Sequence, residues 1–260
     1  MVTPRALILK APGSNCDVET AHACRRVGFE AEVVPVRALL ASPKKHLDAA
    51  QLFIVPGGFS YGDDLGSGTV CGNELRKIRD RLWDFVRTGR LILGICNGFQ
   101  ILTRAGLLPD PMDGRQTVSL TFNDTGRYED RWIRLKVVST RSVFLTEPAT
   151  IELPVAHAEG KFVAKDANEL DLLKRNGQVV LQYVDAEGRP AARHPDNPNG
   201  STDAIAGICD ASGRVLGLMP HPERFQDVTN HPEWTRRRIE EPQGLGFFRN
   251  AFRYLAEAAK

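Results

Sequence analysis

The 260-residue chain has little that would direct it to a membrane or a nucleic acid. It contains no apolar run approaching the roughly 18–20 residues that span a bilayer. The apolar stretch at residues 6–9 is also too short for the core of a secretory signal. The net charge is only +2, so no basic footprint for nucleic acid stands out. We therefore expect neither a membrane nor a nucleic acid as a partner.

Cysteine is scarce, with five residues at positions 16, 24, 71, 96 and 209. Their number is odd, their spacing is irregular, and no two form a C-x-x-C pair. The pattern therefore indicates neither a disulfide framework nor a zinc ribbon, and a reducing cytoplasm fits it best. We expect no metal site. Phosphate-binding loops of the G-x-x-x-x-G-K-[ST] and G-x-G-x-x-G types are missing as well.

What is present is typical of a globular α/β protein, with 42% hydrophobic and 25% charged residues. Short apolar runs stand at residues 5–9, 31–36, 52–55 and 91–93, with helix-compatible segments at 17–27 and 75–86 between them. Strands that are apolar on both faces are typical of buried parallel sheets. The alternation predicts a doubly wound, flavodoxin-like α/β fold, whose active site lies at the carboxyl ends of the strands.

From about residue 118 apolar and polar residues alternate, as in half-exposed antiparallel strands. We expect such antiparallel strands, at residues 118–121 and 132–137, to be added to the mostly parallel sheet, and we expect later strands at residues 179–184 and 215–219. Residues 189–202, rich in Pro, Asn and Gly, predict a long loop, and residues 245–258 an amphipathic helix. Without a repeat or a clear linker, we expect one domain over residues 1–260, with a C-terminal extension from about residue 226.

Cys96 is the strongest candidate for a catalytic residue. It stands between Gly94 and Gly98, directly after an apolar run and before a helix-compatible segment. An isolated cysteine is more often an inert buried residue. Here the flanking glycines allow a sharp strand-to-helix turn, the nucleophile elbow, which projects the central side chain. Free N–H groups and the positive dipole at the helix start favour the thiolate.

The other four cysteines lack this setting. Cys24 lies within a helix pattern and Cys209 at a strand end, so we expect both to be packing residues. Cys16 and Cys71 lie beside glycine-rich turns, which leaves a position near the site open for them.

A cysteine nucleophile needs a base, and the base needs an orienting partner. Three pairs have the spacing that puts a carboxylate beside an imidazole in extended chain, namely His157/Glu159, His221/Glu223 and His231/Glu233. Only His221 follows directly from an apolar strand, so we favour it. His231 stands in a polar segment and is expected at the surface or as a cap. As a candidate for the base, His157 stands between these two histidines, and we expect it to line a loop near the active site.

Gly57 and Gly58 follow the apolar run at residues 52–55. Glycines at a strand end allow backbone amides to point into a cleft, where they could form an oxyanion hole with the N–H of Asn97. The alternative is a simple tight turn.

Three segments together resemble the class I, triad-type glutamine amidotransferases: Gly-Ile-Cys-Asn-Gly-Phe-Gln at 94–100, Pro-Gly-Gly at 56–58 and Met-Pro-His-Pro-Glu at 219–223. More narrowly, the chain is similar to the family of glutaminase subunits of phosphoribosylformylglycinamidine synthases. The narrower resemblance rests on residues 12–17, 56–63, 96–102, 157–162, 197–201 and 219–224.

The resemblance implies that Cys96 attacks L-glutamine, forms a γ-glutamyl thioester, and releases glutamate and ammonia. It also implies that His221 moves the proton, Glu223 holds the tautomer of His221, and Gln100 helps to hold the glutamine. Ammonia would pass to a separate synthetase subunit, with or without a small bridging subunit, which converts formylglycinamide ribonucleotide to formylglycinamidine ribonucleotide in purine biosynthesis. ATP and magnesium are expected on that subunit, and no cofactor is expected in this chain.

Two features depart from the compact members of the family. The compact members have an N-x-S-x-R-F-x-C-R-type stretch, and residues 123–131 of this chain differ from it and resemble the amidotransferase part of the large, fused form of the enzyme. The chain also continues well past Glu223, further than the compact members do. Both features are expected to touch a partner. The alternative functions are another triad amidotransferase, a γ-glutamyl hydrolase, or a catalytically silent regulatory subunit, against which the complete Cys96/His221/Glu223 set argues.

Overall fold

The structure is a computed structural model that describes residues 3–258. Its strands are β1 (Arg5–Lys10), β2 (Glu30–Pro35), β3 (Leu52–Val55), β4 (Leu91–Ile95), β5 (Val118–Thr121), β6 (Glu129–Val137), β7 (Thr150–His157), β8 (Lys161–Ala164), β9 (Val179–Val184), β10 (Ile205–Cys209) and β11 (Val215–Leu218). Its α-helices are α1 (Asp17–Arg26), α2 (Val36–Ala41), α3 (Pro43–Asp48), α4 (Thr69–Arg76), α5 (Arg79–Arg87), α6 (Asn97–Arg104), α7 (Ala167–Arg175) and α8 (Leu245–Ala258).

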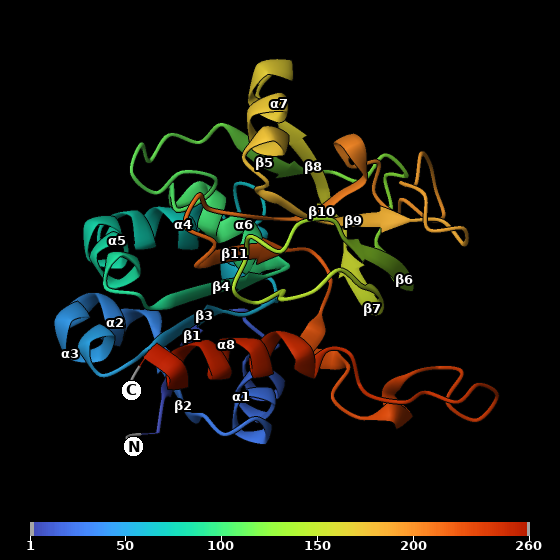
Figure 1. The fold of residues 1–260 in the computed structure, drawn as a ribbon. Helices are drawn as coiled ribbons and strands as arrows, with labels where there is room; N and C mark the ends of the chain where they lie inside the picture. The colour runs from blue at the N-terminus through green and yellow to red at the C-terminus, as the bar shows by residue number, and fades with distance from the viewer. Residues whose placement is uncertain (1–2, 259–260) are drawn as a thin grey trace.

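Nine of the strands in residues 3–258 form one sheet, in the order β2-β1-β3-β4-β11-β10-β9-β6-β7 (Figure 1). Neighbouring strands run parallel from β2 to β11 and antiparallel from β11 to β7. Strands β3 and β4 are buried along their whole length, in keeping with their apolar sequence. The expected α/β fold, with antiparallel strands added to a parallel sheet, is confirmed. The strand expected at residues 118–121, β5, instead pairs with β8 in a separate two-stranded sheet.

Helices cover the parallel part of the sheet from both sides. Figure 1 shows α1 and α8 together on one side of β1, β3 and β4, and α4, α5 and α6 on the other. Phe252 of α8 packs edge-on against Phe29, with ring centroids 5.1 Å apart. The segment after residue 226, expected as a C-terminal extension, therefore supplies a helix that covers the sheet.

One expected helix needs correction. The helix expected across residues 75–86 is two helices, because Ile78 has a non-helical backbone (φ −117°, ψ 18°) between α4 and α5. Asp17 is the first residue of α1, and its carboxylate pairs with Lys10 at 2.7 Å. The sequence also missed β7, β8 and β10, whose burial patterns lack a clear period of two.

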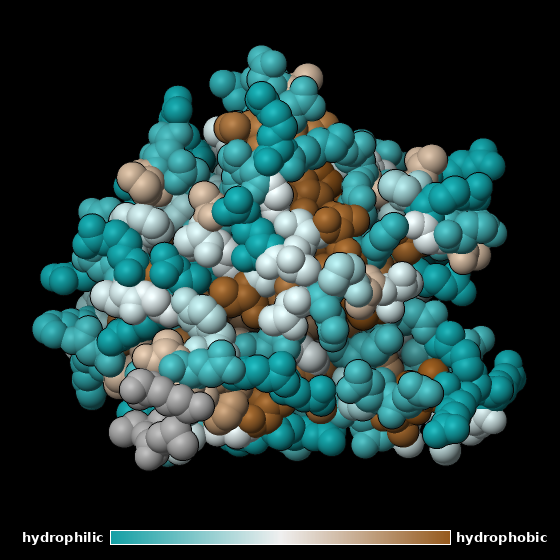
Figure 2. All heavy atoms as spheres, in the orientation of Figure 1, coloured by the Kyte–Doolittle hydropathy of each residue, from teal (hydrophilic) through white to brown (hydrophobic). Residues whose placement is uncertain are grey.

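The surface agrees with the ordinary composition of the chain. The face drawn in Figure 2 is mostly hydrophilic, with small hydrophobic areas scattered among the polar residues. In the part of the chain from residue 3 to residue 258, the helices are all too short or too polar to cross a membrane.

Candidate active site

Cys96 lies where β4 ends and α6 begins, and its backbone has the left-handed φ of 52°. Such a conformation is uncommon for a residue with a side chain, and it is found at strained functional turns. A Cβ at Gly98 would lie 1.9 Å from the carbonyl oxygen of Val55, so only glycine lets α6 come this close to β3. The sharp strand-to-helix turn expected around Cys96 is thus present, and it leaves the side chain 5% exposed.

His221 reaches the same edge of the sheet from the neighbouring strand. Strands β4 and β11 run parallel, with Ile95 beside Leu218, so the chain leaves both strands at one end of the sheet. The N–H of Cys96 donates to the carbonyl of Leu218 at 2.8 Å, which ties the two strand ends together. The parallel-sheet geometry therefore brings Cys96 and His221 to one place.

Glu223 orients the imidazole of His221. His221 Nδ1 donates to Glu223 Oε1 at 2.6 Å, and both side chains are buried. Burial alone would lower the pKa of His221, but the Glu223 carboxylate and the Cys96 sulfur raise this pKa well above its ordinary value. His221 Nε2 has no hydrogen-bond partner within residues 3–258, so this nitrogen is available to exchange a proton.

Cys16 is a second thiol in the site, and the sequence left its position open. It follows β1 and precedes α1, and its Sγ lies 4.0 Å from His221 Nδ1. Arg224 Nη2 donates to the same sulfur at 3.1 Å. Burial raises the pKa of the Cys16 thiol, although its hydrogen bond with His221 acts in the opposite direction. The signal that could have found Cys16 is its place just beyond a buried parallel strand.

The other three cysteines lie outside this group of side chains. Each is buried in a secondary-structure element, and burial raises the thiol pKa of Cys71 and Cys209 to about 12. The packing role expected for Cys24 and Cys209 agrees with this burial. Cys71 is buried in α4.

Gly57 and Gly58 face the same space from the end of β3. A Cβ at Gly57 would lie 2.8 Å from His221 Cε1 and 3.2 Å from Cys16 Sγ, so a side chain there would push into the site. Among residues 3–258, neither the N–H of Gly58 nor that of Asn97 has a backbone acceptor outside its own strand or helix. These two amides are therefore the available donors for an oxyanion.

Gln100 lies one helical turn beyond Cys96, and the protein occupies both ends of its amide. Asn97 Nδ2 donates to Gln100 Oε1 at 2.9 Å, and Gln100 Nε2 donates to the carbonyl of Glu159 at 2.6 Å. Asn97 Nδ2 also donates to Asp63 Oδ1 at 3.3 Å. Burial raises the pKa of Asp63, and the nearby Glu159 carboxylate raises it further. Gln100 thus joins the cysteine helix to the loop after β7.

The segment that carries Asp63 is strained. Tyr61, Asp63 and Leu65 all have φ between 54° and 62°, the left-handed region that favours glycine. Non-glycine residues persist there when the surrounding structure determines them, and such residues gather at functional sites. This segment follows Gly58 directly, so the strain lies beside the candidate oxyanion donors.

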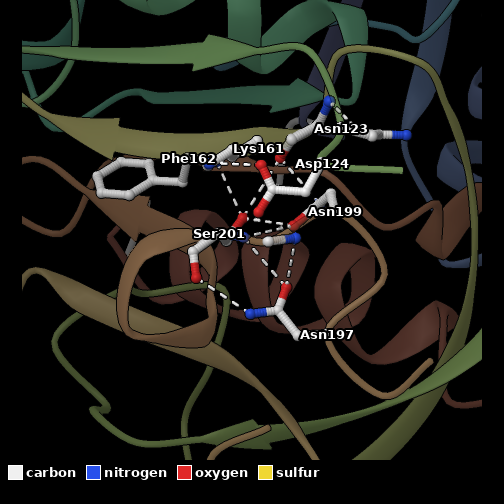
Figure 3. A network of polar contacts seen from close by, with 9 residues as sticks. Asn123, Asp124, Lys161, Phe162, Asn197, Asn199 and Ser201 are labelled. Atoms are coloured by element: carbon white, nitrogen blue, oxygen red, sulfur yellow. Dashed lines mark hydrogen bonds and ion pairs between the residues drawn. The ribbon is translucent and has the colours of Figure 1, made fainter. Parts of the chain in front are cut away.

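His157 ends β7 and stabilises the loop beside the site, as its sequence position suggested. His157 Nδ1 donates to Asn123 Oδ1 at 3.2 Å, and Asn199 Nδ2 donates to His157 Nε2 at 3.4 Å. Asn199 is itself fixed, because its Oδ1 accepts from Ser201 Oγ at 2.7 Å. Figure 3 shows the part of this network that Asn123, Asn197, Asn199 and Ser201 form. The loop at 189–202 was expected, but its buried asparagines were not.

The network around His157 holds two carbonyl groups against the site. The carbonyl of Ala156 lies 3.7 Å from Cys96 Sγ, and that of Glu159 accepts from Gln100. The N–H of His221 donates to the carbonyl of Pro154 at 2.9 Å. Strand β7, at the far end of the strand order from β2, therefore closes the site from the side opposite the parallel strands.

Burial lowers the pKa of His157 to about 4, because it removes water from the charged imidazolium, and the positive charge of nearby His221 lowers this pKa further. In the unfolded chain this imidazole takes up a proton near pH 6.5, whereas in the folded protein it stays neutral until about pH 4. The contribution of His157 to the free energy of unfolding is therefore complete above pH 6.5 and is lost as the pH falls toward 4. We expect the protein to lose about 2 kcal/mol of unfolding free energy through this group between pH 7 and pH 5. Urea unfolding of the protein and of the His157→Gln variant at both pH values measures it. An equal loss of stability in the variant would contradict the assignment.

His231 is buried, and the expected surface position is wrong. Its exposed fraction is 3%, and its ring lies 4.5 Å from that of Trp132. His231 Nε2 is 3.2 Å from Glu152 Oε2, which also pairs with Arg237. Its Nδ1 accepts from the N–H of Glu233 at 3.1 Å, so the capping role holds in part. His231 joins the C-terminal segment to β6 and β7, and it is not part of the group around Cys96.

Comparisons with known proteins give the site a context. The family model for the CobB/CobQ-like glutamine amidotransferase domain matches residues 3–255. A protein of Dehalococcoides mccartyi named phosphoribosylformylglycinamidine synthase subunit PurQ is 43% identical over 256 residues, 97% of this chain and 98% of that protein. A protein of the same name from Methanococcus maripaludis is 41% identical over 269 residues and 98% of both chains.

A solved structure agrees with these relatives. A chain in the structure of PurLQS from Thermotoga maritima has a TM-score of 0.75 and is 34% identical, covering 98% of this chain and 100% of that one. The family model also reaches past residue 226, so the C-terminal segment lies largely within the matched region.

Proposed function

The chain belongs to the family of CobB/CobQ-like glutamine amidotransferase domains, and on that premise we propose that it is the glutaminase subunit of a phosphoribosylformylglycinamidine synthase. The observation that carries this proposal is the identity of 41–43% to proteins named as that subunit, over nearly their whole length. The chain hydrolyses L-glutamine to glutamate and ammonia. The ammonia serves a synthetase subunit that converts formylglycinamide ribonucleotide to formylglycinamidine ribonucleotide in purine biosynthesis.

In the proposed mechanism the Cys96 sulfur attacks the side-chain carbonyl carbon of glutamine. The left-handed turn at Cys96 aims the sulfur into the site, and the N–H groups of Gly58 and Asn97 stabilise the oxyanion of the tetrahedral intermediate. His221, protonated through its raised pKa, gives a proton to the departing nitrogen, and ammonia leaves. A γ-glutamyl thioester on Cys96 remains.

Hydrolysis of the thioester uses the same residues, but His221 now acts as the base and not as the acid. His221 takes a proton from water, the resulting hydroxide attacks the thioester carbonyl, and glutamate leaves as the sulfur is restored. Glu223 keeps Nδ1 of His221 protonated at 2.6 Å, so Nε2 is the nitrogen that exchanges protons. Gln100 acts in this scheme through Asn97 and Glu159, where it shapes the space for the substrate.

The chain supplies no cofactor in this scheme, and ATP and magnesium act on the synthetase subunit. A partner subunit is part of the proposal because the solved relative is a PurLQS assembly. We place the activity in the cytoplasm, since all five cysteines are free thiols.

The substrate and the partner can be tested together. We expect glutamate release from L-glutamine but not from γ-glutamyl peptides, and we expect the rate on L-glutamine to rise when the purine-pathway synthetase is added. A coupled glutamate dehydrogenase assay measures the glutamate, which both kinds of substrate would release, whereas only L-glutamine also yields ammonia. Equal rates on γ-glutamyl peptides would support a γ-glutamyl hydrolase, and an unchanged rate with the synthetase would contradict the proposed pathway.

A further inference from the structure

Three potential metal ligands stand together beside the proposed nucleophile. One ligand atom each from Cys16, His221 and Glu223 lies within 4.8 Å of the other two, and all three side chains are buried. A thiolate, an imidazole nitrogen and a carboxylate oxygen are the ligands that Zn²⁺ takes in proteins. We propose that Cys16, His221 and Glu223 form an inhibitory site for a thiophilic divalent cation such as Zn²⁺.

The distances are close to those that a tetrahedral ion needs. Ligands at the usual zinc–sulfur and zinc–nitrogen distances are about 3.6 Å apart around such an ion. The Cys16 sulfur and His221 Nδ1 are 4.0 Å apart. Nδ1 and Glu223 Oε1 are 2.6 Å apart, so the imidazole and the carboxylate must separate by less than about 1 Å to admit the ion.

The surroundings of the three ligands favour a cation. Glu223 Oε2 is buried and has no hydrogen-bond partner within residues 3–258, a costly state for a carboxylate oxygen that a bound ion would relieve. Gly57 leaves space in front of the sulfur and the imidazole, which a Cβ would fill. Arg224 Nη2 donates to the sulfur at 3.1 Å, and its positive charge lowers the pKa of Cys16 and so favours the thiolate that a metal ion requires.

Binding would stop glutamine hydrolysis by removing the base. The ion displaces the thiol proton of Cys16 and the Nδ1 proton of His221, and both protons go to solvent. His221 is then held through Nδ1, and Glu223 no longer orients it. The inhibitory effect rests on the proposed function of His221, whereas the binding of the ion does not.

Binding is tested with Co²⁺, a spectroscopic substitute for Zn²⁺, through the thiolate-to-cobalt charge-transfer absorption. We expect this band in the wild type, in Cys96→Ala and in Cys209→Ser, and its loss in Cys16→Ser. Cys209 is the matched control because it is also a buried thiol. It lies in β10 opposite Leu216, near the start of β11, whereas His221 follows the other end of β11. Zn²⁺ should also raise the unfolding midpoint of the wild type and not that of Cys16→Ser or Cys16→Ala.

Inhibition is tested by titrating Zn²⁺ into the glutaminase assay, with each variant normalised to its own rate in a chelator. Loss of an outer-shell partner costs about 10–100-fold in metal affinity, so loss of the sulfur ligand should raise the inhibitory concentration by about 100-fold or more. Added chelator should restore the wild-type rate.

Three results would overturn the proposal. The band could persist in Cys16→Ser and vanish in Cys96→Ala, which would put the ion on Cys96. Wild type and Cys16→Ser could be inhibited at the same concentration, or the band could form without inhibition. A protein that binds Co²⁺ through Cys16 but shows no glutaminase activity in chelator would instead contradict the proposed function and leave the metal site standing.

Discussion

Replacing Cys96 with alanine is expected to abolish glutamine-dependent formation of formylglycinamidine ribonucleotide in the reconstituted synthase. Added ammonium salts should still support the reaction at the wild-type rate. The reason is that Cys96 provides the only sulfur aimed by the left-handed turn at the end of β4, whereas the amination step takes place on another subunit. Product formation with glutamine and with ammonium chloride, followed in parallel, measures both arms. We expect a glutamine-dependent rate at least about 10³-fold below wild type.

The control for this experiment is Cys209→Ala, which removes another buried sulfur, from β10. This variant should keep both activities. Glutaminase activity retained in Cys96→Ala would remove Cys96 from the mechanism. Loss of the ammonium-dependent reaction as well would show that the substitution disrupts the assembly, and the thioester should then be sought directly by mass spectrometry of the wild type with glutamine.

The sequence was sufficient to predict the parts of the site that depend on local chemistry and parallel-sheet geometry. Gly94 and Gly98 mark a tight turn around Cys96, and the apolar strand just before His221 predicts that this side chain lies at the same edge of the sheet. Both inferences need only the chain direction of neighbouring strands, which buried parallel strands determine. The structure brings these residues to adjacent strand ends, as expected.

The parts that the sequence could not predict depend on contacts between distant segments. Cys16 comes beside His221 because β1 and β3 are neighbours, which places the turn after β1 against Gly57. Asn199 lies in a loop whose composition predicts exposure, yet it is buried against His157. A polar residue can be buried where it has hydrogen-bond partners, and those partners come from segments that only the fold brings together.

His231 shows the same limit and provides the sharpest control for the proposed base. Both His221 and His231 are buried, both precede a glutamate by two residues, and both contact a carboxylate. Only His221 has a ring nitrogen without a partner, on the side of Cys96. The two histidines therefore differ in the chemistry available to them and not in their degree of burial.

We expect His221→Ala to lower kcat/KM for glutamine by about 10³-fold or more, because in the proposed mechanism His221 Nε2 gives the proton to the leaving nitrogen. His231→Ala should keep kcat/KM within a few fold of wild type and instead lower the unfolding free energy by about 2–4 kcal/mol. It removes a ring packed on Trp132 and leaves the Glu152 carboxylate with one contact fewer. Steady-state kinetics and urea unfolding of both variants separate the two effects. A His231→Ala enzyme that is fully folded but inactive would make His231 the candidate base, and a His221→Ala enzyme with near-normal turnover would remove His221 from the proposed proton transfer.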